Sequence, residues 1–323
     1  MIHPKDLQQI VNDYFATCPY PRQPQSLYDP IAYILSLGGK RLRPVLMLMA
    51  YNLYREHPED ILEQAVGLET YHNFTLLHDD LMDQAPMRRG QPTVHRKWNA
   101  NQAILSGDTM LLMAYRHIAQ CPESQLPQVV RLFTETALEI DEGQQMDIDF
   151  EQRDDVREEE YIEMIRLKTS VLLGCALKMG AILADAPEAD RENLYRFGCQ
   201  LGLAFQLQDD YLDVYGDPKV FGKAIGGDIL EGKKTFMLIN ALARANDQQR
   251  RELTQWLHTD DQPQAKIAAV TALYDQMGID RLAQEKMAYY FDQSRRYIDA
   301  VGLPAERKQY LLAYAQQMMN RRS

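Results

Sequence analysis

The chain has 323 residues, of which 46% are hydrophobic, and its formal net charge at neutral pH is -11. The length suits one large domain or two ordinary ones, and the apolar fraction is typical of a globular protein with a real core. The negative charge argues against nucleic acid or an anionic membrane as a general partner, although a local basic cluster can still bind anions.

The cysteines and the N-terminus indicate the compartment. Cys18, Cys121, Cys175 and Cys199 are scattered and form no CxxC pair, which favours buried thiols in a reducing cytosol over a disulfide framework or a zinc site. The N-terminus lacks the apolar core of a signal peptide, and no segment offers the roughly 18 apolar residues that a transmembrane helix needs. We therefore expect a cytoplasmic protein.

Helical periodicity dominates the chain. After a first helix, four prolines predict a loop: Pro19, Pro21, Pro24 and Pro30. Apolar residues then recur at three- and four-residue spacing, without alternating strands or an Asn-Gly or Asp-Gly hairpin signal. The charged stretch 151–160 predicts a solvated connection followed by a helix start. With no low-complexity linker or repeat, we predict one all-α domain over residues 1–323. The clearest helical segments are 60–83, 126–140, 158–184, 191–216 and 280–302.

Two of these segments end in the same acidic motif, DDxxD. Asp79, Asp80 and Asp83 form the first copy, and Asp209, Asp210 and Asp213 form the second. Residues four apart share a helix face, so the first and last aspartates of each motif point the same way. His72 lies on the first stripe and Gln206 on the second, each seven residues before an aspartate of its motif.

The flanks of both motifs, FTLL and LAFQLQ, are apolar, which argues against two solvated helix faces. Buried carboxylates need cations or strong donors, and a hard, oxygen-rich site suits Mg²⁺. The spacing does not fit a calcium EF-hand. Basic residues that suit phosphate oxygens are interleaved with the motifs. They are Lys40, Arg41, Arg43, Arg88, Arg89, Lys168, Lys223, Lys233 and Lys234, with Thr169 beside Lys168. The sequence therefore predicts magnesium ions that bridge the aspartates to a diphosphate.

An ordered set of motifs supports a family resemblance from about Leu27 to about Asn240. The set is GGKRLRP, LHDDLMD, RRGQPTVH, EGQQMD, LKTS, FQLQDDYLD, GKAIGGD and GKKT. The chain resembles the trans-isoprenyl diphosphate synthases, or polyprenyl synthetases, which include geranylgeranyl and farnesyl diphosphate synthases. The resemblance implies an isoprenoid synthase fold, with helices around a deep central catalytic cavity, and usually a homodimer. It also implies head-to-tail, 1'-4 condensation of isopentenyl diphosphate with an allylic diphosphate.

The resemblance also implies a role for each matching residue. Both aspartate motifs resemble magnesium-binding motifs. Thr169, Gln206 and the Lys168 carbonyl are expected to stabilise an allylic carbocation. The residues that match the isopentenyl diphosphate site are Lys40, Arg43, His72 and Arg89. The residues that match the allylic diphosphate site are Arg88, Lys168, Thr169, Gln206, Lys223 and Lys233.

Three residues before the first motif are expected to set product length. Helix geometry puts Thr75 and Tyr71 on the stripe of Asp79, whereas Phe74 lies off it. A bulky Phe74 with a small Thr75 and an uninterrupted DDxxD is similar to geranylgeranyl synthases of the archaeal type. We therefore expect a short product, C20 before C15, with C15 favoured if Tyr71 closes the cavity.

Two alternatives stay open at this point. A terpene cyclase shares helices, magnesium and DDxxD, but it does not need GGKRLRP, and its second metal motif normally differs. A non-catalytic partner subunit of a prenyl synthase is the other alternative, and the intact aspartates argue against it.

Overall fold

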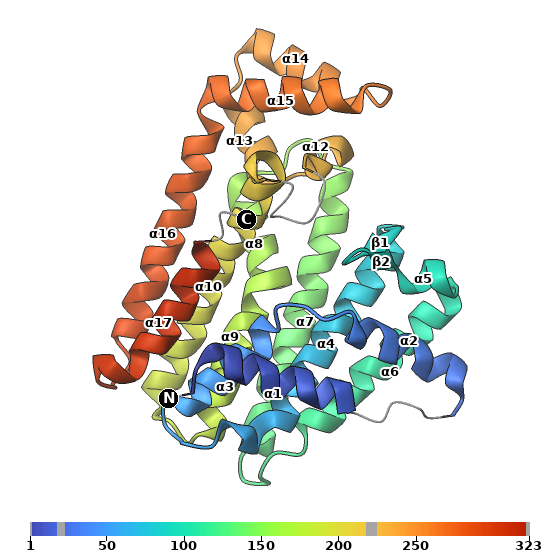
Figure 1. Cartoon of the computed structure of the whole chain (residues 1–323). Helices are drawn as coiled ribbons and strands as arrows, with labels where there is room; N and C mark the ends of the chain where they lie inside the picture. Colours follow the sequence, from blue (N-terminus) through green and yellow to red (C-terminus); the bar gives the residue numbers. More distant parts are fainter. Residues whose placement is uncertain (1, 18–22, 218–224, 321–323) are drawn as a thin grey trace. The chain divides into compact units, whose positions relative to one another are not determined.

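Helices carry most of the residues that the computed structural model describes, which are 2–17, 23–217 and 225–320 (Figure 1). This confirms the predicted all-α class. The chain forms two compact units, each assembled from three separate segments. The first unit comprises Met1–Thr134, Cys175–Leu194 and Gly302–Leu311, and the second unit comprises Glu135–Gly174, Tyr195–Val301 and Leu312–Ser323. The expectation of one domain over the whole chain stays a prediction.

The N-terminal segment of the first unit consists mainly of helices. Its short strands β1 and β2 pair antiparallel around Gly90, a two-residue hairpin that the sequence pattern did not predict. The elements are α1 (Pro4–Thr17), α2 (Gln25–Ser36), α3 (Leu42–Asn52), η1 (Pro58–Ile61), α4 (Leu62–Met82), β1 (Met87–Arg88), β2 (Gln91–Pro92), α5 (Val94–Lys97) and α6 (Ala100–Ile118).

The later helices include four that continue from one unit's residues into the other's, namely α7, α9, α10 and α17. The elements are α7 (Leu126–Glu151), α8 (Glu158–Ile165), the π-helical turn η2 (Arg166–Ser170), α9 (Val171–Leu183), α10 (Glu188–Tyr215), α12 (Gly227–Glu231), α13 (Phe236–Arg244), α14 (Asp247–Leu257), α15 (Pro263–Met277), α16 (Ile279–Asp299) and α17 (Ala305–Met319). Each of the five predicted helical segments is found, and 158–184 is interrupted only by the π turn.

One part of the predicted proline loop is wrong. Pro30 lies inside α2, whereas Pro19 and Pro21 fall outside the described residues. A proline inside a helix has no N–H for the carbonyl four residues earlier, which here is that of Ser26. The Gln102 side chain of α6 supplies the missing donor, with its Nε2 at 3.0 Å from the Ser26 oxygen. The tertiary contact therefore replaces the lost helical hydrogen bond.

Helices α4 and α6 pack along each other and form the centre of the first unit. A glycine on each helix permits this approach. A Cβ at Gly67 of α4 would lie 2.9 Å from the Ile118 side chain of α6, and a Cβ at Gly107 of α6 would overlap the His78 ring of α4. The pairing of Gly67 with the end of α6, and of Gly107 with the end of α4, makes the two helices antiparallel. Apolar residues of α2, α4 and α6 close the core beside them.

The second unit has its own apolar core, built from α8, α10, α13, α15 and neighbouring residues. Helices α14 and α15 pack as a pair (Figure 1). Side chains cap the starts of α13 and α14. At α14, for example, Asn246 and Gln249 form a reciprocal capping box. Lys266 of α15 is only 2% exposed, and its ammonium group donates to the carbonyl oxygens of Leu230 and Leu257, each at 3.1 Å. This buried lysine therefore ties the ends of α12 and α14 to α15.

Within the described ranges, no helix combines the length and the apolar character that crossing a membrane requires.

Candidate active site

The first acidic motif lies at the C-terminal end of α4. Asp79 and Asp80 belong to its last turn, and Asp83 is its C-cap residue. The helix dipole is negative at this end, so three carboxylates here attract cations strongly. Asp80 is 3% exposed, and both its oxygens accept hydrogen bonds from Arg88, at 2.7 Å from Nε and 2.8 Å from Nη2. Asp80 thus orients Arg88, whereas Asp79 is half-buried and Asp83 is exposed.

The arginine hairpin and the glycine-rich loop meet in the first unit. Arg89 has a left-handed backbone conformation, with φ of 52°, and its guanidinium donates to the carbonyl of Gly38. A Cβ on Gly39 would lie 2.8 Å from the Arg89 guanidinium, and the φ of Gly39, 135°, is one that other residues rarely adopt, so glycine suits this position. The structure therefore brings Arg89 to the loop that carries Lys40, as the predicted isopentenyl diphosphate site requires.

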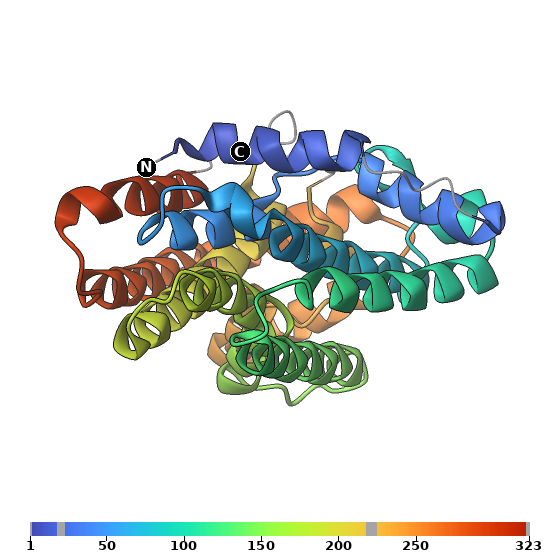
Figure 2. The same cartoon turned by 90° about the horizontal axis from the view of Figure 1, so that it is seen from below.

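A buried ion pair holds that loop in place. The Arg41 guanidinium lies 2.9 Å from Glu69 of α4, and both side chains are 2% exposed. Arg41 also donates to the Leu35 carbonyl at 2.8 Å and to Asn12 of α1 at 3.3 Å. Helix α1, drawn in the darkest blue in Figure 2, therefore contributes to the loop's position. Arg41 was quoted in the sequence only as one of several basic residues, and its buried partner could not be identified there.

His72 lies in a strongly electropositive setting. Burial lowers the pKa of its imidazole well below the ordinary value, and the charges of Arg43, Arg89, Arg88 and Arg41 lower it further. The ring is therefore neutral at neutral pH and can offer one N–H as a donor. Four arginines that act on one histidine create a local field suited to an anion, despite the negative charge of the whole chain.

The three predicted chain-length residues lie together on α4. Tyr71 is 1% exposed, and its ring packs against Phe74 with 5.6 Å between ring centroids. Phe74 also packs against His78, with ring centroids 4.8 Å apart. Thr75 turns its hydroxyl back to the carbonyl of His72, at 2.9 Å. The face of α4 that precedes Asp79 is thus lined by aromatic rings and one threonine methyl group.

The second acidic motif lies near the C-terminal end of α10 and is tied into a hydrogen-bond chain. Buried Asp210 accepts from the Tyr161 hydroxyl and, at 3.1 Å, from the Gln206 side-chain amide. The amide oxygen of Gln206 in turn accepts from Thr169, also at 3.1 Å. The pKa of Asp210 is raised to about 6, because the effect of burial exceeds the opposing effect of the hydrogen bonds from Tyr161 and Gln206. These hydrogen bonds together fix the direction of the Gln206 amide dipole.

Thr169 and Lys168 lie in the π-helical turn η2. Turns of this kind often occur at functional sites. Gly143 of α7 allows the turn to approach closely, since a Cβ there would overlap the Lys168 backbone nitrogen. The sequence placed both residues on a helix but gave no sign of the local change in hydrogen-bond register.

Asp147, in the EGQQMD motif, holds two predicted diphosphate ligands. Its carboxylate lies 2.7 Å from the Lys168 ammonium group and 3.8 Å from that of Lys233. Burial acts to raise the Asp147 pKa, but the charges of Lys233 and Lys168 outweigh it and keep the pKa below its ordinary value. Asp147 therefore stays ionised and keeps the two cations side by side. The predicted ligand Lys223 lies outside the described residues.

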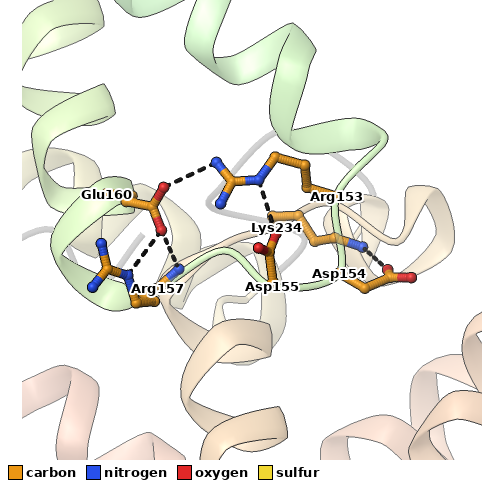
Figure 3. A network of polar contacts seen from close by, with 6 residues as sticks. All are labelled: Arg153, Asp154, Asp155, Arg157, Glu160 and Lys234. Carbon is orange, nitrogen blue, oxygen red and sulfur yellow. Dashed lines mark hydrogen bonds and ion pairs between the residues drawn. The ribbon is translucent and has the colours of Figure 1, made fainter.

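Lys234 has a different environment from its neighbour Lys233. It pairs with Asp154 at 3.2 Å, in a network with Arg153, Asp155, Arg157 and Glu160 (Figure 3). The network covers the connection between α7 and α8, where Glu160 accepts from the Arg157 backbone at 3.1 Å and caps α8. Asp154 is fully exposed, so this ion pair contributes little stability. Lys234 thus belongs to a solvated surface network.

Asp228 completes a crowded group of carboxylates in the second unit. Its backbone N–H donates to Asp213 at 3.0 Å. The pKa of Asp228 is raised to about 8, first by burial and then by the charges of Asp210 and Asp213. Carboxylates that repel one another in this way favour a bound cation.

The donors fit a hard divalent cation that is only partly held by protein. Among the described residues, no three acidic, imidazole or thiol groups are close enough to hold a metal ion by themselves. Mg²⁺ usually binds through one or two carboxylates and completes its shell with water and substrate phosphate. Carboxylate oxygens beside phosphate-binding cations match that description. Sequence reasoning missed Asp147, Tyr161 and Asp228 as parts of the site, although Asp147 and Asp228 stand in motifs that it quoted.

Comparisons with known proteins agree with this arrangement. The profile of the Polyprenyl synthetase family matches residues 24–276. The chain is 34% identical to a geranylgeranyl pyrophosphate synthase of Geoglobus acetivorans over 323 residues, which cover 98% of each chain. It is 38% identical to a short chain isoprenyl diphosphate synthase of Methanocaldococcus jannaschii over 258 residues, which cover 80% of this chain and 78% of the relative.

Solved structures have the same fold. A crystal structure of a geranylgeranyl pyrophosphate synthase superposes with a TM-score of 0.95 at 43% identity and covers 100% of both chains. A geranylgeranyl pyrophosphate synthetase from Pyrococcus horikoshii superposes with a TM-score of 0.91 at 30% identity, covering 98% of this chain and 97% of the other. The predicted family is therefore confirmed, and the chain belongs to the polyprenyl synthetase family.

Proposed function

We propose that this chain is a prenyltransferase that condenses isopentenyl diphosphate with allylic diphosphates, head to tail, and releases a short trans-prenyl diphosphate. The observation that carries the proposal is that each unit holds one DDxxD motif beside basic side chains of the same unit. In the first unit Asp80 orients Arg88. In the second unit Asp147 pairs with Lys168 and Lys233, beside the hydrogen-bond chain that ends at Asp210.

The basic residues bind the two diphosphates. Lys40, Arg43, His72 and Arg89 bind isopentenyl diphosphate, and the field of four arginines at His72 supports this role. Arg88, Lys168, Thr169, Gln206, Lys223 and Lys233 bind the allylic diphosphate. When that diphosphate arrives, it takes the place of Asp147 as the counter-charge of Lys168 and Lys233. Asp147 positions the two lysines before binding and does not contact the reacting atoms.

Magnesium is the cation that we assign to the aspartates. Asp79, Asp83 and Asp209 would contact it, whereas Asp80 and Asp210 position Arg88 and Gln206. A direct metal contact of Asp80, Asp210 or Asp213 stays a prediction. Bound magnesium would neutralise negative charge on the departing diphosphate.

The chain's own residues handle the positive charge that forms when the allylic C–O bond breaks. Gln206 and Thr169, together with the Lys168 carbonyl, present oriented dipoles to the allylic cation without attacking it. The double bond of isopentenyl diphosphate then adds to the cation, and the released diphosphate removes the proton. Because His72 has a lowered pKa among arginines, it serves as a hydrogen-bond donor and is not the base.

The product is expected to be C20 before C15. The ring of Phe74 lies between His78, next to Asp79, and the buried ring of Tyr71, which supports its role as the first barrier to the growing chain. A relative from Natronomonas pharaonis that is 37% identical over 292 residues is a geranylfarnesyl diphosphate synthase. Product length therefore differs among relatives of similar identity, so overall identity does not determine it for this chain.

We also propose a homodimer in the cytoplasm. Helix α6 exposes Ile104, Leu105 and Leu112, whose side chains are 46%, 58% and 70% exposed. Three large apolar side chains on one exposed helix support a contact with a second copy of the chain.

The test is to incubate the purified chain with isopentenyl diphosphate and either dimethylallyl, geranyl or farnesyl diphosphate, and to identify products by mass spectrometry. Chain elongation that requires isopentenyl diphosphate and stops when magnesium is chelated supports the proposal. Cyclic hydrocarbon from an allylic substrate alone would indicate a terpene cyclase. No turnover by the chain alone, with activity restored by a second prenyl synthase subunit, would indicate a non-catalytic partner.

A further inference from the structure

A continuous row of aromatic rings runs through the first unit from the acidic motif to the surface. Phe74 packs on Tyr71, Tyr71 packs on Phe133 and Phe133 packs on Tyr115, with successive ring centroids 5.6, 5.1 and 4.8 Å apart. We call these four residues the aromatic ladder. Phe74 also contacts His78, which directly precedes Asp79, so the ladder begins beside the motif.

The ladder joins three helices at its buried centre. Phe74 and Tyr71 come from α4, Phe133 comes from the first half of α7, and Tyr115 comes from α6. Phe133 is 0% exposed and Tyr71 is 1% exposed, and the last two contacts are edge-to-face. Edge-to-face packing of buried rings fixes their relative orientation. The four rings therefore form a stack with a fixed order, from Phe74 to Tyr115.

An apolar groove lies at the far end of the ladder. Tyr115 lines this groove, whose volume is about 710 Å³, together with Ala119, Leu126 and Val130. The Tyr115 hydroxyl donates to Thr134 at 3.1 Å, which restrains the ring that lines the groove. Tyr115 is thus the last ring between the buried ladder and the surface.

We infer that Phe133 and Tyr115 limit product length only in variants in which the side chains of Phe74 and Tyr71 have been replaced by smaller ones. This inference rests on the proposed function, since it assumes a prenyl chain that grows from Asp79 along α4. The order of the stack determines the order of action. The growing prenyl chain meets Phe74 first, then Tyr71, then Phe133, and finally Tyr115, beyond which the groove opens.

The spacing of the rings predicts the size of each step. An isoprene unit has four carbons along the chain, which span roughly 5 Å at ordinary bond lengths. Consecutive rings of the ladder are also about 5 Å apart. Each removed ring therefore provides room for about one more isoprene unit, provided that every ring before it is already gone.

The experiment compares products of the wild type with those of nested variants: Phe74→Ala, Phe74→Ala with Tyr71→Ala, and both with Phe133→Ala. Phe133→Ala is also made alone, and Phe133→Leu replaces it wherever the alanine variant does not fold. The matched control is Phe197→Ala in the double-variant background, because Phe197 is equally buried, at 0% exposure, but lies outside the ladder.

We expect each nested step to lengthen the main product by about one C5 unit, and Phe133→Ala alone to leave it unchanged. Adding Tyr115→Ala to the triple variant should broaden the product distribution toward long chains, because the groove then continues the cavity. The inference is overturned if Phe133→Ala alone lengthens the product, if it adds nothing in the double variant, or if Phe197→Ala has the same effect. A wild type that makes no prenyl diphosphate would refute the proposed function, a result distinct from all of these.

Discussion

Replacing Arg41 with methionine should damage both the stability of the protein and one of its two substrate sites. The substitution removes the cation that pairs directly with Glu69, at 2.9 Å, in a place where both side chains are 2% exposed. The carboxylate of Glu69 would keep the hydrogen bond from the Asn73 side-chain amide, at 3.3 Å. An isolated buried charge is unfavourable, and breaking such a pair typically costs about 3–5 kcal/mol.

The chain offers a matched control. Arg55 and Asp185 form an ion pair of nearly the same length, 3.0 Å, in the same unit, but their side chains are 52% and 62% exposed. Because water solvates both groups already, Arg55→Met should lower the free energy of unfolding by only about 0–1 kcal/mol. Urea denaturation followed by circular dichroism measures both variants. Equal destabilisation by the two substitutions would show that burial does not decide the effect.

The same substitution should separate the two substrates. Lys40 and Arg43 flank Arg41, so loss of its anchor should raise the KM for isopentenyl diphosphate by roughly tenfold or more, because small displacements of binding groups are costly. The allylic KM should change little. The double variant Arg41→Met with Glu69→Leu removes the isolated charge and should recover most of the stability but not the KM. A raised allylic KM alone would refute the assignment of this loop.

Three further predictions concern the aspartates and the diphosphate sites. Asp79→Ala and Asp209→Ala should each leave a folded protein whose kcat falls by at least about a hundredfold, and near-normal turnover at saturating magnesium would contradict the metal assignment. Arg43→Ala should raise the KM for isopentenyl diphosphate and Lys233→Ala that for the allylic substrate; the opposite pattern would mean that the two sites are exchanged. Without metal, the pKa of Asp228 is about 8 in the folded protein and about 4 in the unfolded chain. Its contribution to the free energy of unfolding is therefore fully present below about pH 4 and is lost as the pH rises through about 8. Added Mg²⁺ opposes that loss, so the increase in Tm on adding Mg²⁺ should be larger at pH 8 than at pH 6 and smaller in Asp228→Asn. Equal increases at both pH values would contradict this account.

The sequence predicted those features that depend on local periodicity. The stripes of α4 and α10 follow from four-residue spacing, which a helix converts directly into a shared face. The motifs also placed Lys168 and Thr169 correctly on a helical segment. Burial and partners of single residues depend on the tertiary fold, so the pairing of Asp80 with Arg88 and of Asp147 with two lysines could not be predicted.

Two errors have different origins. Pro30 is a helix breaker by local rules, yet Gln102, far along the chain, provides the donor that makes it acceptable. The hairpin of β1 and β2 is only two residues long on each side, too short for any alternating pattern to be visible. A distant contact thus explains the first error, and the shortness of the strands explains the second.

The first unit is assembled from segments far apart in the sequence, which has a consequence for synthesis on the ribosome. Asp190 joins three distant parts of the chain, since it accepts from the Tyr54 hydroxyl at 2.9 Å and from the Gly302 backbone at 2.8 Å. Gly302 follows Thr134 by roughly 170 residues, which take about 10–30 s to translate at about 5–20 residues per second. The N-terminal segment must therefore wait for the C-terminal one. During that interval its unfinished apolar surface is available to chaperones.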